Sequence, residues 1–448
     1  MAERGGRSGG AALPALLQQA GAHYRAGRRR EALALCRRIL AAEPGRADVL
    51  ALAGQIAGEL GLDAEAVAHY AAAIGAKPDF AEAHYNLGNV LARLGRHEEA
   101  VAPYSRAAEL RPELVAVHAN LGNALHALGR WDEAAASYRR AIRLAPGAAE
   151  AHRNLGLALN AAGARDRALE CFRRAVALKE DWPNALQSLA NALMEGGLWR
   201  EAVSICDRWL RLAPANVEAL GLKAVALEEL GERDAARYLV DFDRLVEMIE
   251  FETPPNGFSD IAAFNAALAR HALEHPTLQV PPRGDPRYHC ATLRITDEFL
   301  AEPKGPAAAF ERMIETAVSS YLQRLARLDA AHPFLVHPPR RWQLTSWAAV
   351  LDGEGTLDPH VHYAGYVSGV YYPKIPAPIG APGQGEAGWF QFGGNPGRFP
   401  CTTQPDTRTI QPREGLMLLF PSYFYHRTLP FTAPESRVSI AFDAVPAA

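Results

Sequence analysis

The stretch that decides the second half of the chain is Asp358-Pro359-His360-Val361-His362-Tyr363-Ala364-Gly365-Tyr366-Val367-Ser368-Gly369-Val370-Tyr371-Tyr372. Its two histidines stand at i and i+2, beside a run rich in Val, Tyr and Ser that is typical of a β-strand. Alternate side chains of a strand point to the same face, with Cα atoms roughly 6–7 Å apart. We therefore expect His360 and His362 to converge on one metal ion.

Two later segments supply the other residues that such a site needs. His426 lies 64 residues after His362, at the end of Phe420-Pro421-Ser422-Tyr423-Phe424-Tyr425. Arg437 follows eleven residues later, and Ser439 falls on the same face of its predicted strand. Imidazole suits Fe, Zn, Cu and Ni, and three protein ligands leave positions open for a bidentate cosubstrate and O₂. The Arg437 fork with Ser439 predicts a carboxylate clamp beside the metal.

Composition bounds the remaining possibilities. A chain of 448 residues predicts two or three domains. The net charge of −3 gives no electrostatic footprint for nucleic acid or for anionic lipid. Five cysteines without CxxC spacing disfavour a disulfide framework. No signal peptide or membrane span is apparent, so a cytoplasmic location with no nucleic-acid or membrane partner is expected.

The first half of the chain repeats every 34 residues. Prolines recur in this register at 44, 78, 112, 146 and 214, as do glycines at 54, 88, 122 and 156 and aromatic residues at 70, 104, 138 and 172. Small residues let two helices approach, aromatic residues fill the space between them, and proline ends the second helix. This pattern is the signature of tetratricopeptide repeats and predicts about seven stacked units, the last one capping.

Asparagines recur beside the signature glycines, at Asn86, Asn89, Asn120, Asn123, Asn154 and Asn191. In such arrays these positions belong to the first helix of each unit, which lines the concave groove. Asn86-Leu87-Gly88-Asn89 and Asn120-Leu121-Gly122-Asn123 resemble the asparagine ladder of O-linked N-acetylglucosamine transferase. An amide can pair with any peptide backbone, so the resemblance implies peptide binding. The alternative is that the amides hold neighbouring helices together.

The pattern changes after the repeats. We expect a disordered N-terminus at residues 1–12, repeats at 13–250, a linker at 251–260 and a second domain at 261–448. Helices are predicted at 261–274 and 306–328, and strands at 342–347, 366–372, 389–392, 416–420 and 437–442. Short strands between Pro/Gly-rich turns, preceded by helices, favour a double-stranded β-helix (jelly roll) with flanking helices.

The second domain resembles the Fe(II)/2-oxoglutarate-dependent oxygenases, in particular a group with His-x-His, Ser-Gly-Val-Tyr-Tyr and Phe-Pro-Ser…His motifs. The resemblance covers about 342–442. It implies that His360 and His426 bind Fe(II) and that Arg437 with Ser439 binds 2-oxoglutarate. Tyr372 and Gln343 are further candidates for the cosubstrate pocket.

His362 departs from the resemblance, because the wider superfamily has Asp or Glu at this position. A third histidine leaves the site cationic and could weaken Fe(II) binding or alter the reaction with O₂. Asp358 is the alternative carboxylate ligand, although Pro359 disfavours a strand that extends so far. We expect His362 to be the third ligand.

Three functions remain open. The first is a dioxygenase, using Fe(II), 2-oxoglutarate and O₂, that hydroxylates a protein or peptide bound in the repeat groove. The second is a non-catalytic adaptor with a degenerate jelly roll. The third is an oxygenase of small molecules that the repeats dock to a partner.

Overall fold

The computed structural model describes residues 12–281, 292–301, 304–328, 331–336, 338–381 and 383–447. The chain forms two compact units, Met1–Glu180 and Asp181–Ala448. The predicted disordered segment 1–12 lies outside the described residues, except for Ala12, where the first helix begins.

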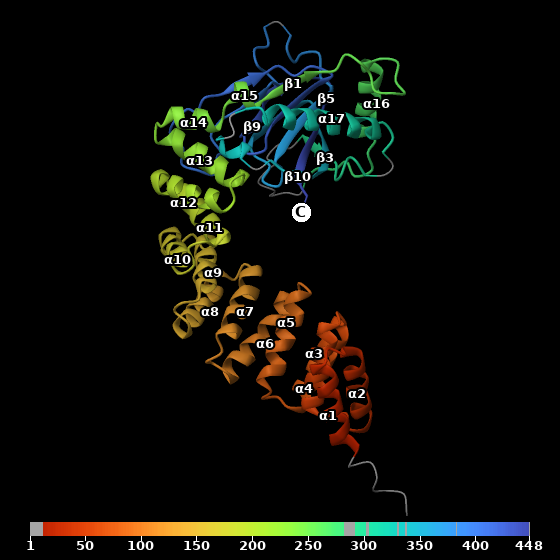
Figure 1. The fold of residues 1–448 in the computed structure, drawn as a ribbon, viewed down its shortest axis with the longest axis vertical. Helices are drawn as coiled ribbons and strands as arrows, with labels where there is room; N and C mark the ends of the chain where they lie inside the picture. The colour runs from red at the N-terminus through yellow and green to blue at the C-terminus, as the bar shows by residue number, and fades with distance from the viewer. Residues whose placement is uncertain are drawn as a thin grey trace, which may run out of the picture. The chain divides into compact units, whose positions relative to one another are not determined.

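The first unit consists of paired helices stacked side by side (Figure 1). Its helices are α1 (Ala12–Arg25), α2 (Arg29–Ala42), α3 (Ala47–Glu59), α4 (Asp63–Ala76), α5 (Ala81–Arg93), α6 (His97–Leu110), α7 (Val115–Ala127), α8 (Trp131–Leu144), α9 (Ala149–Ala161) and α10 (Arg165–Leu178). Consecutive pairs start 34 residues apart, from Ala47 through Ala149, so the predicted repeat array is confirmed.

A close contact between a glycine and an aromatic ring recurs in the helix pairs from α3/α4 to α9/α10. A Cβ atom built on Gly122 would lie 2.6 Å from the ring of Tyr138, which is buried. Gly88 stands in the same relation to Tyr104 in the preceding unit. The two backbones therefore approach as closely as the flat ring allows, which only a residue without a side chain permits.

The second unit begins with the last repeat helices, α11 (Pro183–Glu195), α12 (Trp199–Leu212), α13 (Val217–Glu229) and α14 (Arg233–Leu239), followed by a single turn, α15 (Phe242–Leu245). These helices contact the C-terminal part of the chain directly. The carboxylate of Glu229 accepts hydrogen bonds from Thr402 and Thr403. A Cβ atom on Gly221 would lie 3.3 Å from the carbonyl oxygen of Tyr423.

Two antiparallel sheets form the C-terminal part. The six-stranded sheet has the order β1-β8-β5-β10-β3-β2, and the four-stranded sheet has the order β4-β9-β6-β7. The strands are β1 (Glu247–Glu250), β2 (Leu293–Ile295), β3 (Trp342–Leu351), β4 (Glu354–His360), β5 (Val367–Lys374), β6 (Phe390–Phe392), β7 (Arg408–Ile410), β8 (Leu416–Pro421), β9 (His426–Thr432) and β10 (Arg437–Pro446).

Helices cover one face of the six-stranded sheet. Helices α16 (Ile261–Leu273) and α17 (Ala307–Leu325) supply apolar side chains to that face, and a short 3-10 helix, η1, spans Pro333–Leu335. Phe310 of α17 lies 5.2 Å from the ring of Tyr371 and 6.2 Å from that of Phe442, measured between centroids. The predicted fold class, a helical repeat array followed by a β domain with flanking helices, is confirmed.

The structure adds strands that the pattern did not predict. Glu247–Glu250, expected within the capping repeat, forms the edge strand β1 and pairs with β8. Strand β4 ends at His360, so His362 lies in the loop that follows. The expectation that the two histidines share one strand was therefore wrong. The run 426–432, which has three polar residues at its start and a proline inside, is strand β9. Pairing with β4 and β6 overrides its weak strand propensity.

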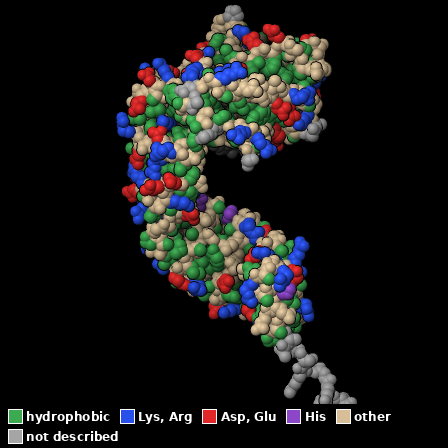
Figure 2. All heavy atoms as spheres, viewed as in Figure 1, with side chains coloured by type: hydrophobic (Ala, Val, Ile, Leu, Met, Phe, Trp, Pro, Cys, Tyr) green, Lys and Arg blue, Asp and Glu red, His purple; other side chains and the backbone are tan. Residues whose placement is uncertain are grey.

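The visible surface mixes charges of both signs. Lys and Arg side chains are interspersed with Asp and Glu (Figure 2). Among the described residues, none of the helices combines the length and the apolar character needed to cross a bilayer.

Candidate metal centre and cosubstrate pocket

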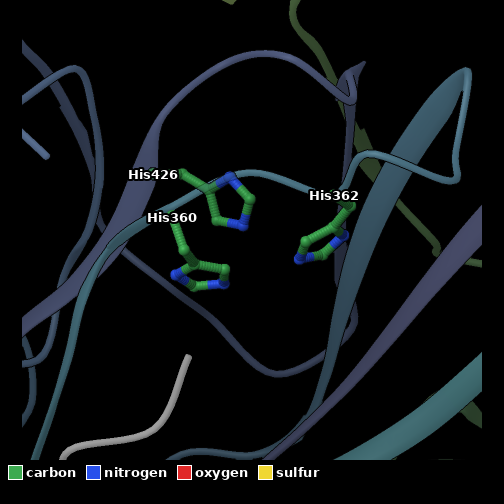
Figure 3. Close-up of side chains that lie close together, drawn as sticks. All are labelled: His360, His362 and His426. Carbon is green, nitrogen blue, oxygen red and sulfur yellow. The ribbon is translucent and has the colours of Figure 1, made fainter. Parts of the chain in front are cut away.

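Three histidines from the four-stranded sheet and its adjoining loop face one another (Figure 3). His360 ends β4, His362 lies two residues further on, and His426 begins β9. Strand pairing places His360 directly opposite His426. One ring nitrogen of each of the three residues lies within 4.8 Å of the others. The residues that are far apart in sequence therefore form one ligand set.

The Nδ1 atom of each histidine has an oxygen partner. Nδ1 of His360 lies 2.8 Å from the carbonyl oxygen of Asp358, and Nδ1 of His426 lies 2.9 Å from that of Phe424. Nδ1 of His362 lies 2.8 Å from Oδ1 of Asp443. Each oxygen accepts a hydrogen bond from an Nδ1–H group, which leaves the Nε2 lone pair for a metal ion.

Burial favours the neutral, ligating form of His426. Its side chain is 4% exposed. Burial, and then the neighbouring His360 and His362, hold the pKa of His426 well below its usual value. A neutral imidazole at physiological pH can bind a metal without first losing a proton.

A pocket opens between the two sheets beside the three histidines. It is lined by side chains of both sheets, among them Leu293, Trp347, Leu357, Tyr372, Phe390, Phe420, Thr428, Arg437 and Ser439. Trp347 and Phe390 pack against the rings of His362 and His426. The pocket is thus mostly apolar, with a few polar groups on its β10 side.

Arg437 is the main polar group of this pocket, and its charge has no anionic partner among the described residues. Its side chain is 1% exposed, Nη1 donates to Oγ1 of Thr428 at 2.9 Å, and Nε has no hydrogen-bond partner. The guanidinium lies 5.2 Å from the ring of Tyr372, whose hydroxyl is also buried without a partner. Burial lowers the pKa of Arg437 and raises the pKa of Tyr372 to about 12.

These features fit a metal ion and an anionic cosubstrate. A buried guanidinium with an unused donor is costly unless an anion pairs with it. A carboxylate could accept from Nε of Arg437 and from the hydroxyl of Tyr372, and Ser439 lines the same pocket. Three Nε2 atoms on the other side could hold Fe(II) and leave open positions.

The structure separates the other two candidates from this pocket. Gln343 is exposed on β3 and is not among the residues that line the pocket. The Asp358 side chain is exposed, and only its backbone carbonyl contributes, by accepting from His360. Asp443 was not a candidate, although strand alternation places it on the same face of β10 as Arg437 and Ser439.

The predicted groove asparagines form hydrogen bonds between repeat helices. Oδ1 of Asn89 accepts from the Tyr104 hydroxyl at 2.8 Å and from Nδ2 of Asn120 at 2.9 Å. Oδ1 of Asn123 accepts in the same way from Tyr138 and from Asn154. The amides therefore connect successive units.

The two remaining positions have different partners. Asn86 lies near the hydroxyl of Tyr70 and lowers its pKa, against the larger raising effect of burial. In the second unit, Nδ2 of Asn191 donates to Oε1 of Glu218 at 2.8 Å.

Comparison with known families agrees with this architecture. Residues 345–443 match the family model described as "Putative 2OG-Fe(II) oxygenase". Residues 54–95, 88–129 and 122–163 match a model described as "TPR repeat", and 188–241 match "Tetratricopeptide repeat". The chain therefore carries tetratricopeptide repeats and, towards its C-terminal end, a domain that matches the 2OG-Fe(II) oxygenase family.

Similar solved structures each cover less than half of the chain. MamA is 24% identical, with a TM-score of 0.36 over 38% of this chain and 92% of its own. YrrB, described as a TPR protein with an unusual peptide-binding site, is 25% identical, with a TM-score of 0.37 over 39% and 89%. PilF of Pseudomonas aeruginosa is 22% identical, with a TM-score of 0.37 over 44% and 90%. A search of curated proteins gives no match.

Proposed function

We propose that this protein is an Fe(II)- and 2-oxoglutarate-dependent dioxygenase. The observation that carries the proposal is the pocket itself: three converging imidazoles lie beside a buried arginine that has an unused donor. Neither feature is needed to fill an apolar core: the three Nε2 lone pairs suit a metal ion, and the buried guanidinium is costly without an anion. The family match of residues 345–443 supports the same activity.

Each side chain has a distinct role in this proposal. His360, His362 and His426 hold the metal through Nε2, with their Nδ1 bonds fixing the orientation of the rings. Arg437, with Tyr372 and Ser439, binds the carboxylate of 2-oxoglutarate that points away from the metal. Phe390, Phe420 and Leu357 exclude water from the bound cosubstrate. We interpret the two sheets as the predicted jelly roll.

The overall reaction is a hydroxylation. The substrate R–H, 2-oxoglutarate and O₂ yield R–OH, succinate and CO₂, with one oxygen atom entering each of the first two products. When bound, the iron supplies O₂ activation coupled to this oxidative decarboxylation. The protein positions the target C–H bond beside the metal.

We propose that the substrate is a protein or peptide bound by the repeats. The inter-repeat bonds use Oδ1 of Asn89 and Asn123, so their Nδ2 groups are not part of those bonds and could donate to a peptide backbone. The same bonds also favour a second candidate, an oxygenase of small molecules. Amides that connect repeat helices have a structural role and need not bind a peptide.

The first experiment tests the site. The purified full-length protein is titrated anaerobically with Fe(II) and 2-oxoglutarate, and the visible metal-to-ligand charge-transfer band is recorded. We expect a band for the wild type and its loss in His426→Ala and Arg437→Ala. If the wild type bound neither iron nor 2-oxoglutarate, the proposal would fail and the adaptor function would replace it.

The second experiment tests the substrate class. Asn123→Ser replaces one groove amide with a shorter hydroxyl and should raise the KM for a peptide substrate while leaving substrate-free turnover of 2-oxoglutarate unchanged. His152→Gln, also on a repeat helix but bonded to the Pro146 carbonyl, is the matched control. Equal KM values in the two variants and the wild type would favour the small-molecule candidate.

A further inference from the structure

His362, the third ligand in the proposed metal centre, belongs to a buried polar network around Asp443. Nδ1 of His362 lies 2.8 Å from Oδ1 of Asp443, which is 5% exposed on β10. The hydroxyl of Ser368, on β5, lies 2.6 Å from the same oxygen. The Ser368 hydroxyl also lies 2.9 Å from Oγ of Ser422, in the turn after β8.

The backbone around His362 closes tightly over this network. The amide of His362 donates to the carbonyl oxygen of Ser422 at 3.1 Å. A Cβ atom built on Gly365 would lie 2.6 Å from Oγ of Ser422 and 3.1 Å from the side chain of Asp443. Because there is no room for a side chain at Gly365, the loop of residues 361–365 lies directly on the buried carboxylate.

The charge of Asp443 needs a counterpart. Its hydrogen bonds in the described part of the chain come from His362 and from the hydroxyl of Ser368, and it forms no ion pair with Lys or Arg there. Burying a carboxylate is costly unless a positive charge lies close by. A divalent cation on Nε2 of His362 would provide that charge through the imidazole ring.

We infer that Asp443 is a positioning residue for the metal, and this inference rests on the proposed function. Three neutral imidazoles bring no negative charge to a divalent ion. Asp443 supplies negative charge through the imidazole ring of His362. It holds His362 as the Nδ1–H tautomer, directs Nε2 to the metal and makes Nε2 a stronger electron-pair donor. Carboxylate–histidine–metal arrangements of this kind typically change metal affinity by 10–100-fold when the carboxylate is lost.

Asp443→Asn isolates the charge, because the amide oxygen can still accept from Nδ1–H. The full-length protein is titrated anaerobically with Co(II), without 2-oxoglutarate, and the visible absorption of the bound ion gives the Kd. We expect Asp443→Asn to raise the Kd by about 10–100-fold. The melting temperature without metal should stay the same or rise, because a buried charge is removed.

Two controls separate charge from packing. Asp352→Asn, a carboxylate bonded to Arg294 and Ser436 outside the pocket, should leave the Kd for Co(II) unchanged. Ser368→Ala removes one hydrogen bond to Asp443 but keeps its charge, so its effect on the Kd should be much smaller than that of Asp443→Asn. A purely structural network predicts similar losses for Ser368→Ala and Asp443→Asn.

A double variant decides the inference even if Asp443→Asn folds poorly. In His362→Asp/Asp443→Asn, the carboxylate moves onto the metal and the amide can donate to it. We expect this variant to bind Co(II) at least tenfold more tightly than His362→Ala. Wild-type affinity in Asp443→Asn, or a double variant no better than His362→Ala, would overturn the inference. Absence of Co(II) binding by the wild type would instead contradict the proposed function.

Discussion

Arg437 destabilises the fold of the protein without ligand and is essential to the proposed binding of 2-oxoglutarate. Its charge is buried and its Nε has no partner, so it opposes folding until an anion arrives. An apolar residue of similar length removes this cost. It also removes the charge and the free Nε donor that would hold a carboxylate.

We predict that Arg437→Met keeps or raises the melting temperature of the protein without ligands but abolishes its stabilisation by 2-oxoglutarate. For the wild type, ligand at 100 times its Kd adds about 2.7 kcal/mol to the free energy of unfolding. Thermal unfolding with Mn(II), with and without 2-oxoglutarate, measures both effects. Arg294→Met, which removes the partner of Asp352, should retain the shift. A ligand-induced shift in Arg437→Met would place the carboxylate elsewhere.

At the scale of single residues, sequence spacing predicted most of the pocket, although His362 lies in a loop and does not share a strand with His360. His360, His362, His426, Arg437, Ser439 and Tyr372 all line one pocket. Gln343 does not line the pocket, because alternation predicts the face of a strand on which a side chain lies but not which end of that face borders the pocket. Asp443 shares the face of Arg437 and could have been found by alternation, but its role depends on a loop contact that sequence spacing does not specify.

At the scale of elements, the repeat helices contain glycines in two different environments. Gly122 lies against the ring of Tyr138, with no room for a methyl group. Gly75, near the end of α4, has no heavy atom within 4 Å of a Cβ position. The same substitution should therefore change stability in opposite directions.

We predict that Gly122→Ala lowers the free energy of unfolding by about 1–3 kcal/mol, because the added methyl group overpacks the helix pair. Gly75→Ala should raise it by up to about 1 kcal/mol, because alanine favours the helix and no contact opposes it. Urea unfolding followed by helical circular dichroism measures both. A higher free energy of unfolding in both variants would show that the ring of Tyr138 moves aside for the methyl group.

Elements with a strong period were predicted from sequence, and those fixed by distant pairing were not. The 34-residue period identified helices from α1 to α13, and apolar runs identified β5 and β8. Strand β9 has no such run, and β4 contains Pro359. Their partner strands determine them, and the sequence alone does not show which strands will pair.

In the whole molecule, the last repeats belong to the same compact unit as the β domain. The hydroxyl of Tyr423 donates to the carbonyl oxygen of Leu239 at 2.5 Å, and that of Tyr321 donates to Leu245 at 2.5 Å. Both tyrosines are buried. Removing the last repeats would leave these hydroxyls and strand β8 uncovered.

We therefore predict different behaviour for two fragments. A fragment of residues 181–448 should be monomeric and bind Co(II) with the affinity of the full chain. A fragment of residues 251–448, cut at the turn-rich join, should aggregate or lose the site, because β8 becomes an exposed edge. Size-exclusion chromatography and Co(II) titration test both. Equal folding and affinity of the two fragments would show that the last repeats are dispensable to the β domain.

The position of Gly221 has a consequence for how such a chain can evolve. It occupies the repeat position held by Tyr85, Ala119, Arg153 and Gln187 in earlier units, and there it admits the carbonyl oxygen of Tyr423. Duplication or loss of a 34-residue unit before residue 181 leaves the contact between Gly221 and Tyr423 intact. A copy inserted between the unit that contains Gly221 and the β domain would separate these two residues. The gene can therefore lengthen or shorten its array on one side only, and its final unit is inherited together with the domain that follows.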